Sequence, residues 1–115
     1  MEIPLVNWPG VVRHAHDAEL DYVEDQSAWE GAKTMLASGC DESDTLLDAT
    51  GAVFAFVCDP RGEVRLQATG KIRTLQEVLG LVKAHAAQAD SCCVAKLFAP
   101  SIVEAFRIVK ATPVD

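Results

Sequence analysis

Positive charge is scarce in this chain. Its 115 residues include 10 Lys and Arg against 17 Asp and Glu, which gives a net charge of −7. Surfaces that bind nucleic acid or adhere to anionic membranes need an excess of Lys and Arg. We therefore expect neither nucleic acid nor a membrane among the partners of this protein.

Long apolar runs are also missing. No stretch approaches the roughly 20 apolar residues that a membrane-spanning helix needs. The start, MEIPLVNWPG, lacks the basic segment and the apolar segment of a secretory signal. We therefore expect a cytoplasmic protein, and since disulfides are rare in reducing compartments we expect its four cysteines to be free thiols.

Several familiar site motifs are absent. The chain has no C-x-x-C, and the acidic segment CDESD at 40–44 lacks the ligand spacing and central Gly of a calcium loop. The segment ATGKIRT at 68–74 has a Gly-Lys pair but not the other residues of a phosphate-binding loop. We expect no cofactor and no catalytic residues, and we favour a protein that is not an enzyme.

The composition indicates one folded unit. Hydrophobic residues make up 50% of the chain, and a chain of 115 residues is long enough to bury a core without staples. We therefore expect residues 1–115 to form a single small globular domain.

Turn and capping signals divide the first half of the chain. Alternating residues at 11–15 and 20–24 predict a hairpin. Ser27 and Glu30 have the spacing of a capping box, which predicts a helix that Ser38 and Gly39 end. A three-stranded meander follows, in which the turns DATG (48–51) and DPRG (59–62) flank an apolar strand at 53–58.

The second half is predicted to be largely helical. Thr74 with Glu77 and Ser101 with Glu104 are two further capping boxes, which predict helices over 75–89 and 101–110. The short apolar run at 92–98 is predicted to be a strand by its length. The order is β-β-α-β-β-β-α-β-α, an α+β fold with a mainly antiparallel sheet, one possible parallel crossover and helices packed on one side.

The chain resembles a known family in several segments. NWPGVV, DAELDYVED, LLDATGAVFAF and EVLGLVKAHAAQADSCCVAKLFAPSIVEAF are similar to a family of small, uncharacterised gammaproteobacterial proteins. The likeness covers about residues 6 to 110 and is weakest between 37 and 44. It implies a bacterial, cytoplasmic setting, and it implies no activity because the family is a domain of unknown function.

A metal or thiol site is one hypothesis. His14 and His16 would point to the same side of a strand, with Asp17 as a third ligand, and His85 lies on the apolar side of its helix near Cys92 and Cys93. The alternative for the cysteines and His85 is a place in the core, with one hydrogen bond from the imidazole to the backbone. For the HAHD segment the alternative is a polar hairpin end.

The charge distribution supports a different hypothesis. Between residues 17 and 48 there are ten acids and one base, Lys33, whereas residues 61–110 have eight bases and four acids. Such a dipole can steer a basic partner or a second copy of the chain. We favour a small non-enzymatic domain that binds a protein partner or itself through Asp17, Glu19, Asp21, Glu24 and Asp25; the alternative is the metal or thiol site of His14, His16, His85 and Cys92/Cys93.

Overall fold

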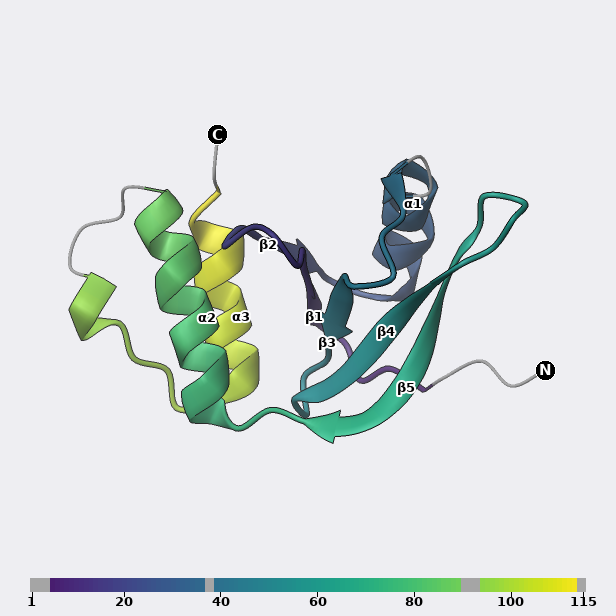
Figure 1. Cartoon of the computed structure of the whole chain (residues 1–115). Helices are drawn as coiled ribbons and strands as arrows, with labels where there is room; N and C mark the ends of the chain where they lie inside the picture. Colours follow the sequence, from purple (N-terminus) through teal and green to yellow (C-terminus); the bar gives the residue numbers. More distant parts are fainter. Residues whose placement is uncertain (1–4, 37–38, 90–93, 114–115) are drawn as a thin grey trace.

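A computed structural model describes residues 5–36, 39–89 and 94–113 (Figure 1). It has a five-stranded antiparallel sheet with the order β2-β1-β3-β4-β5, and three α-helices. The predicted α+β class and antiparallel sheet are confirmed. The elements are β1 (Gly10–Arg13), β2 (Leu20–Val23), α1 (Gln26–Leu36), β3 (Thr45–Leu47), β4 (Ala52–Cys58), β5 (Val64–Ile72), α2 (Leu75–Gln88), the 3-10 turn η2 (Val94–Lys96) and α3 (Ile102–Ala111).

The helices cover both faces of the sheet, so the prediction that they pack on one side is wrong. On one face, Val11, Leu47 and Val53 pack with α2 and α3, whose central core residue is the fully buried Phe106. On the other face, Val12 and its neighbours pack with Trp29 of α1. Figure 1 shows α2 and α3 side by side at one end of the sheet and α1 apart from them. Because successive strand residues point to opposite faces, Val11 and Val12 each need a cover of their own.

The predicted turns of the meander are confirmed. Gly51 and Gly62 have φ values of 87° and 88°, and the Gly62 amide donates to the Asp59 carbonyl at 2.8 Å, which closes the DPRG turn. Glycine adopts this left-handed conformation without strain. These short connections are the reason that β3, β4 and β5 pair as antiparallel neighbours.

Two of the three predicted helix caps are found at their predicted positions. Thr74 and Glu77 form the reciprocal capping box of α2, and Ser101 accepts from the Glu104 amide at the start of α3. The cap of α1 is instead Asp25, whose Oδ1 accepts from the Ala28 amide at 2.8 Å. Aspartate and serine are both good caps, and here Asp25 begins the helix earlier and leaves Ser27 inside its first turn.

The strand predicted over 92–98 is wrong in its described part. Residues 94–96 form the 3-10 turn η2, and neither 97 nor 98 belongs to a strand. The parallel crossover is wrong for the same reason, since every pairing among the described strands is antiparallel. Cys92 and Cys93 lie outside the described residues. A short apolar run is equally compatible with a strand and with a helical turn, and its length alone cannot decide between them.

Candidate functional site

The acidic surface expected from the sequence lies along the β1–β2 hairpin and the turn into α1. Four of its five acids are exposed and Glu19 is half-buried. Four acids make contacts within the fold: Asp17 accepts from the Glu19 amide, Asp21 pairs with His14, Glu24 pairs with Lys110 and Asp25 caps α1. We call Asp17, Glu19, Asp21, Glu24 and Asp25 the acidic surface.

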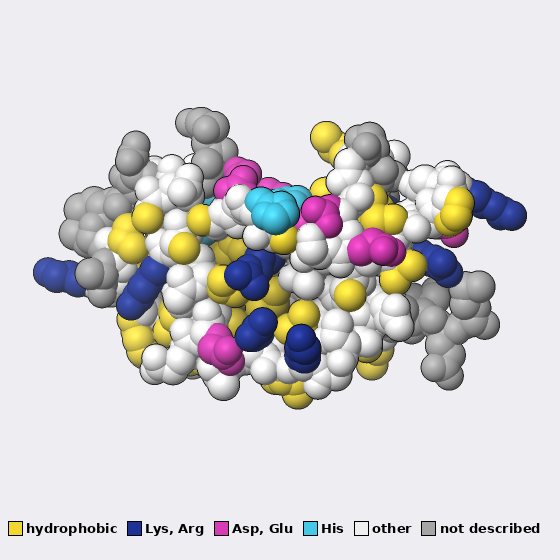
Figure 2. Space-filling model, viewed as in Figure 1, with side chains coloured by type: hydrophobic (Ala, Val, Ile, Leu, Met, Phe, Trp, Pro, Cys, Tyr) yellow, Lys and Arg dark blue, Asp and Glu magenta, His cyan; other side chains and the backbone are white. Residues whose placement is uncertain are grey.

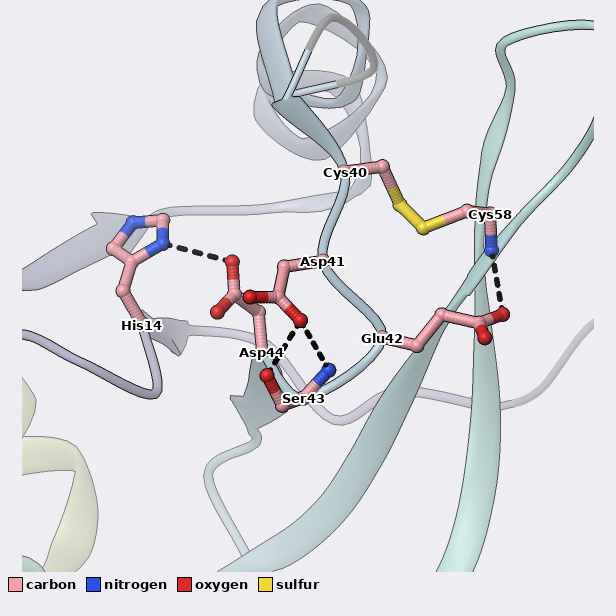
Figure 3. The surroundings of a disulfide bond; sticks show 7 residues. All are labelled: His14, Cys40, Asp41, Glu42, Ser43, Asp44 and Cys58. Atoms are coloured by element: carbon pink, nitrogen blue, oxygen red, sulfur yellow. Dashed lines mark hydrogen bonds and ion pairs between the residues drawn. A yellow bond between two sulfur atoms is a disulfide. The ribbon is translucent and has the colours of Figure 1, made fainter.

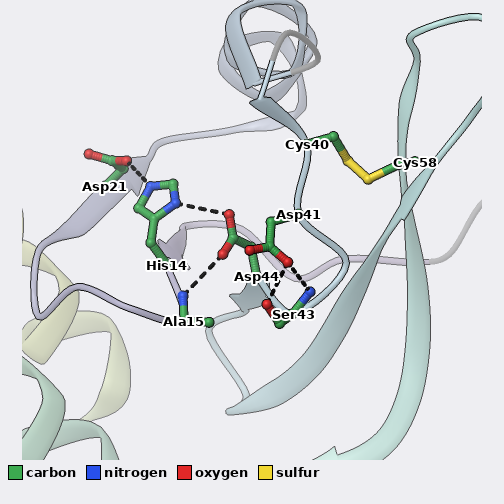
Figure 4. Close-up of polar contacts among 8 residues, drawn as sticks. All are labelled: His14, Ala15, Asp21, Cys40, Asp41, Ser43, Asp44 and Cys58. Atoms are coloured by element: carbon green, nitrogen blue, oxygen red, sulfur yellow. Dashed lines mark hydrogen bonds and ion pairs between the residues drawn. A yellow bond between two sulfur atoms is a disulfide. The ribbon is translucent and has the colours of Figure 1, made fainter.

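His14 joins two carboxylates (Figure 4). Its Nε2 lies 2.8 Å from Asp21 Oδ2 and its Nδ1 lies 3.1 Å from Asp44 Oδ2, while Asp44 Oδ1 accepts from the Ala15 amide at 3.0 Å. Burial by itself lowers the pKa of His14, but the hydrogen bonds and charges of Asp21 and Asp44 outweigh it and raise the pKa. The protonated ring, with two N–H donors, is the form that fits this place.

The structure does not support the metal alternative. Both ring nitrogens of His14 face carboxylates, and a metal ligand needs a nitrogen with a free lone pair. His16 and Asp17 are exposed in the hairpin turn. Within residues 5–36, 39–89 and 94–113 there is no group of three or more His, Cys, Asp or Glu side chains that could hold a metal ion.

His85 is a structural residue. It is buried in α2, where its Nδ1 accepts from the Leu20 amide at 2.9 Å and its Nε2 lies 2.6 Å from the Thr112 carbonyl oxygen. The Nδ1 acceptor role places the proton on Nε2, which donates to that carbonyl. His85 therefore links β2 to the end of α3, as the core alternative predicted, and neither ring nitrogen is left to activate a thiol.

Cys40 and Cys58 form a disulfide, so the prediction of four free thiols is wrong for this pair (Figure 3). The bond ties the loop after α1 to the end of β4. Further along that loop Glu42 accepts from the Cys58 amide at 3.3 Å, and Asp44 reaches His14. The 18-residue separation of the two cysteines hides their proximity, which is created only when β3 pairs with β4.

A groove of about 340 Å³ opens on the sheet face that α2 and α3 cover only in part. Its floor contains Leu47, Val53 and Ala55. Figure 2 shows this side of the molecule, where dark-blue Lys and Arg side chains stand around a yellow apolar floor. Leu47 and Val53 also belong to the core beneath α2 and α3, so the groove begins where the helix cover ends.

The groove is cationic. Of the ten described residues that line it, three are basic (Arg13, Lys71 and Arg73) and none is acidic. Arg73 pairs with Glu77 of α2 at 3.2 Å, whereas the side chains of Arg13 and Lys71 form no hydrogen bond or ion pair with any described residue. We call these ten residues the cationic groove.

The turn between β3 and β4 holds one end of the cationic groove. The Arg73 amide donates to the Gly51 carbonyl at 2.8 Å, and a Cβ at Gly51 would overlap the Arg73 carbonyl oxygen. Asp48 is fully buried in this turn, where it accepts from the amides of Thr50, Ala52 and Asn7 at 2.9, 3.1 and 3.0 Å. These contacts position the junction between β5 and α2, and with it Arg73.

Sequence reasoning missed the cationic groove. It considered the segment ATGKIRT only as a phosphate-binding loop, which it is not, yet Lys71 and Arg73 of that segment line the groove. One signal was available: Arg13 follows Val11, and Thr45 precedes Leu47, at alternate positions on one sheet face. Polar residues at positions that would otherwise be core indicate an uncovered part of a sheet.

The family of this chain follows from a comparison of its sequence. The family model for DUF4144, described as a protein structure with unknown function, matches residues 8–109. The chain belongs to the DUF4144 family. No curated protein matches this DUF4144 chain.

The fold of this DUF4144 chain is similar to a solved one. An NMR structure of a protein from Shewanella amazonensis has a TM-score of 0.69 and 18% sequence identity, and the match covers 98% of this chain and 95% of that one. At this identity the likeness shows the shared fold alone. Among the described helices of this DUF4144 chain, none is long and apolar enough to cross a membrane.

Proposed function

We propose that this DUF4144 chain is a non-enzymatic domain that binds a protein partner, or a second copy of itself, through the acidic surface. The observation that carries the proposal is an excess of negative charge: against its five acids, the ion pairs of the described residues supply His14 and Lys110, and Arg107 adds a longer-range positive charge at Glu24. Such a field attracts and orients a basic partner before contact is made.

The internal contacts of the acidic surface leave most of its charge in place. A hydrogen bond from a backbone amide orients a carboxylate without neutralising it, as at Asp25 with Ala28 and at Asp17 with Glu19. Asp17, Glu19 and Asp25 form no ion pair with a described residue. The surface therefore presents a negative field on side chains that the fold already holds.

Charge reversal at two of these acids tests the proposal. We choose Asp17→Lys with Glu19→Lys, because Asp21 holds His14 and Asp25 caps α1, so that changes there would disturb the fold. The control is Glu63→Lys, an exposed acid in the β4–β5 turn, which matches each single reversal, Asp17→Lys or Glu19→Lys, in its change of charge. We expect proteins retained from a bacterial lysate by the parent and by the control to be lost with the double variant, or a parent dimer to dissociate in sedimentation velocity. An unchanged set of partners and an unchanged oligomeric state would refute the proposal.

A bacterial, cytoplasmic location is part of the proposal. The bacterial source of the similar solved structure supports the bacterial setting, while a disulfide between Cys40 and Cys58 is a bond that reducing compartments disfavour. Alkylation of thiols in intact cells before lysis decides the matter. Modified Cys40 and Cys58 would support the cytoplasm, and a bond protected from alkylation would place the protein in an oxidising compartment.

A further inference from the structure

The cationic groove has charges that the fold does not use. In a chain with 17 acids and 10 bases, three bases gather around one groove whose described lining contains no carboxylate. Like charges that share a groove repel each other, and this repulsion is reduced when an anion enters. Arg13 is half-buried as a whole residue, and its side chain forms no hydrogen bond or ion pair with a described residue.

The donors of the cationic groove suit an oxyanion. A guanidinium offers parallel N–H groups that match the two oxygens of a carboxylate or a phosphate, and an ammonium adds a compact positive charge. Arg13 on β1 and Lys71 on β5 line the groove from opposite sides of β3 and β4, so their long side chains can approach an anion in the groove from two sides. The Thr45 hydroxyl is a further donor, whereas the Thr69 hydroxyl already donates to the Val53 carbonyl at 2.8 Å.

The floor of the cationic groove suits an apolar body. Ala55 and a small part of Val53 present aliphatic carbons between the polar rims, and Leu47 lines the groove with only 1% of its surface exposed. A volume of about 340 Å³ lies at the lower end of the range for small-molecule sites, roughly 300–1,000 Å³. A site of this size with an apolar floor and charged rims selects ligands by a charged group and a compact apolar part together.

We propose that the cationic groove binds a small organic anion, in which a carboxylate or phosphate group contacts Arg13 and Lys71 and an apolar body lies on Val53 and Ala55. The site is distinct from the acidic surface and does not depend on the protein-binding function proposed above. A nucleic-acid strand fits less well, because the acids of residues 17–48 would repel a long polyanion that extends beyond the groove.

An NMR titration of the ¹⁵N-labelled full chain tests the proposal with three probes. Phenyl phosphate and 3-phenylpropionate combine an anionic group with an apolar body, and benzyl alcohol is their neutral counterpart. We expect both anions to shift amide signals of β1, β3, β4 and β5 around the groove in a saturable manner and the alcohol to bind much more weakly. The tighter of the two anions identifies phosphate or carboxylate as the preferred group.

Charge-removing variants assign the binding to these residues. Arg13→Gln and Lys71→Gln should each weaken binding of the better probe roughly tenfold or more, as expected for lost charge-assisted hydrogen bonds. Arg61→Gln and Lys96→Gln, which remove exposed cations away from the groove, should leave the affinity unchanged. If the spectrum of one groove variant shows that it does not fold, the affinity of the other variant still tests whether the groove cations bind the anion.

Three kinds of result would overturn the proposal. One is the absence of saturable shifts with both anions. Another is equal binding of the neutral alcohol, or equal losses in the groove and control variants. The third is tighter binding of a single-stranded oligonucleotide, with shifts that extend beyond the groove, which would make this surface a nucleic-acid site.

Discussion

The carboxylates of residues 17–48 and the cations of the cationic groove differ in whether they form hydrogen bonds within the fold. Asp48, Asp44 and Asp25 accept hydrogen bonds from backbone amides and hold turns or begin a helix. The side chains of Arg13 and Lys71 form no hydrogen bond or ion pair with any described residue. Acidic residues, which are numerous in this chain, can thus stabilise the fold, whereas basic residues, which are fewer, can remain available to bind a ligand.

The comparison predicts where substitutions are costly. If the acids are structural, removing one should lower stability, and if the groove cations are free, removing one should not. The predictions below run from the largest expected loss to the smallest.

Asp48→Ala should have the largest effect. The change removes the hydrogen bonds that the amides of Thr50, Ala52 and Asn7 donate to a buried carboxylate, and a hydrogen bond to a charged group contributes about 1.5–3 kcal/mol. We expect the free energy of unfolding, measured in urea, to fall by about 4 kcal/mol or more. Asp17→Asn is the matched control at an exposed site and should cost no more than about 0.5 kcal/mol. Similar losses in both variants would show that Asp48 has no special structural role.

Removal of the disulfide should cause the second-largest loss of stability. The double variant Cys40→Ser with Cys58→Ser frees a loop that spans 18 residues, and the chain entropy of such a loop corresponds to about 3 kcal/mol. We expect urea unfolding of the oxidised parent and of the variant to differ by about that amount, and a thiol reductant to remove the difference. A parent whose stability is indifferent to the reductant would contradict the bond.

His14 should give a pH-dependent effect. Its pKa is raised in the folded state by Asp21 and Asp44, so the protonated ring stabilises the fold fully below the unfolded value of about 6.5. That contribution is lost as the pH rises through the higher folded value. We therefore expect the stability of the parent, relative to His14→Gln, to decrease from pH 6 toward neutral and higher pH. An NMR titration of the imidazole that gave a pKa below 6.5 would contradict this sign.

The parts of the fold that were predictable rest on contacts between near neighbours in the chain. The capping box of Thr74 and Glu77 and the turn from Asp59 to Gly62 each depend on residues three apart. The prediction of the α1 cap was wrong because Asp25 and Ser27 are competing candidates within one turn. The strand predicted over 92–98 was wrong in its described part because a short apolar run fits both a strand and a helical turn.

The site was less predictable because it depends on strand register. Arg13, Thr45 and Lys71 lie on three strands, and only the pairing of β1, β3, β4 and β5 brings them to one face. The disulfide has the same origin. A count of charges along the chain located the acidic segment, but it could not show which of its carboxylates accept hydrogen bonds from the backbone.

Arg13→Gln and Lys71→Gln should have the smallest effect on stability. Neither side chain has a partner among the described residues, and exposed or half-exposed substitutions away from such contacts change the free energy of unfolding by no more than about 0.5 kcal/mol. We expect any change to be a slight increase in the free energy of unfolding, since each substitution reduces the repulsion between cations in the groove. If either variant instead lost as much stability as Asp48→Ala in the same urea experiment, its cation would be structural. The distinction between structural acids and free groove cations would then be wrong, because both kinds of residue would stabilise the fold.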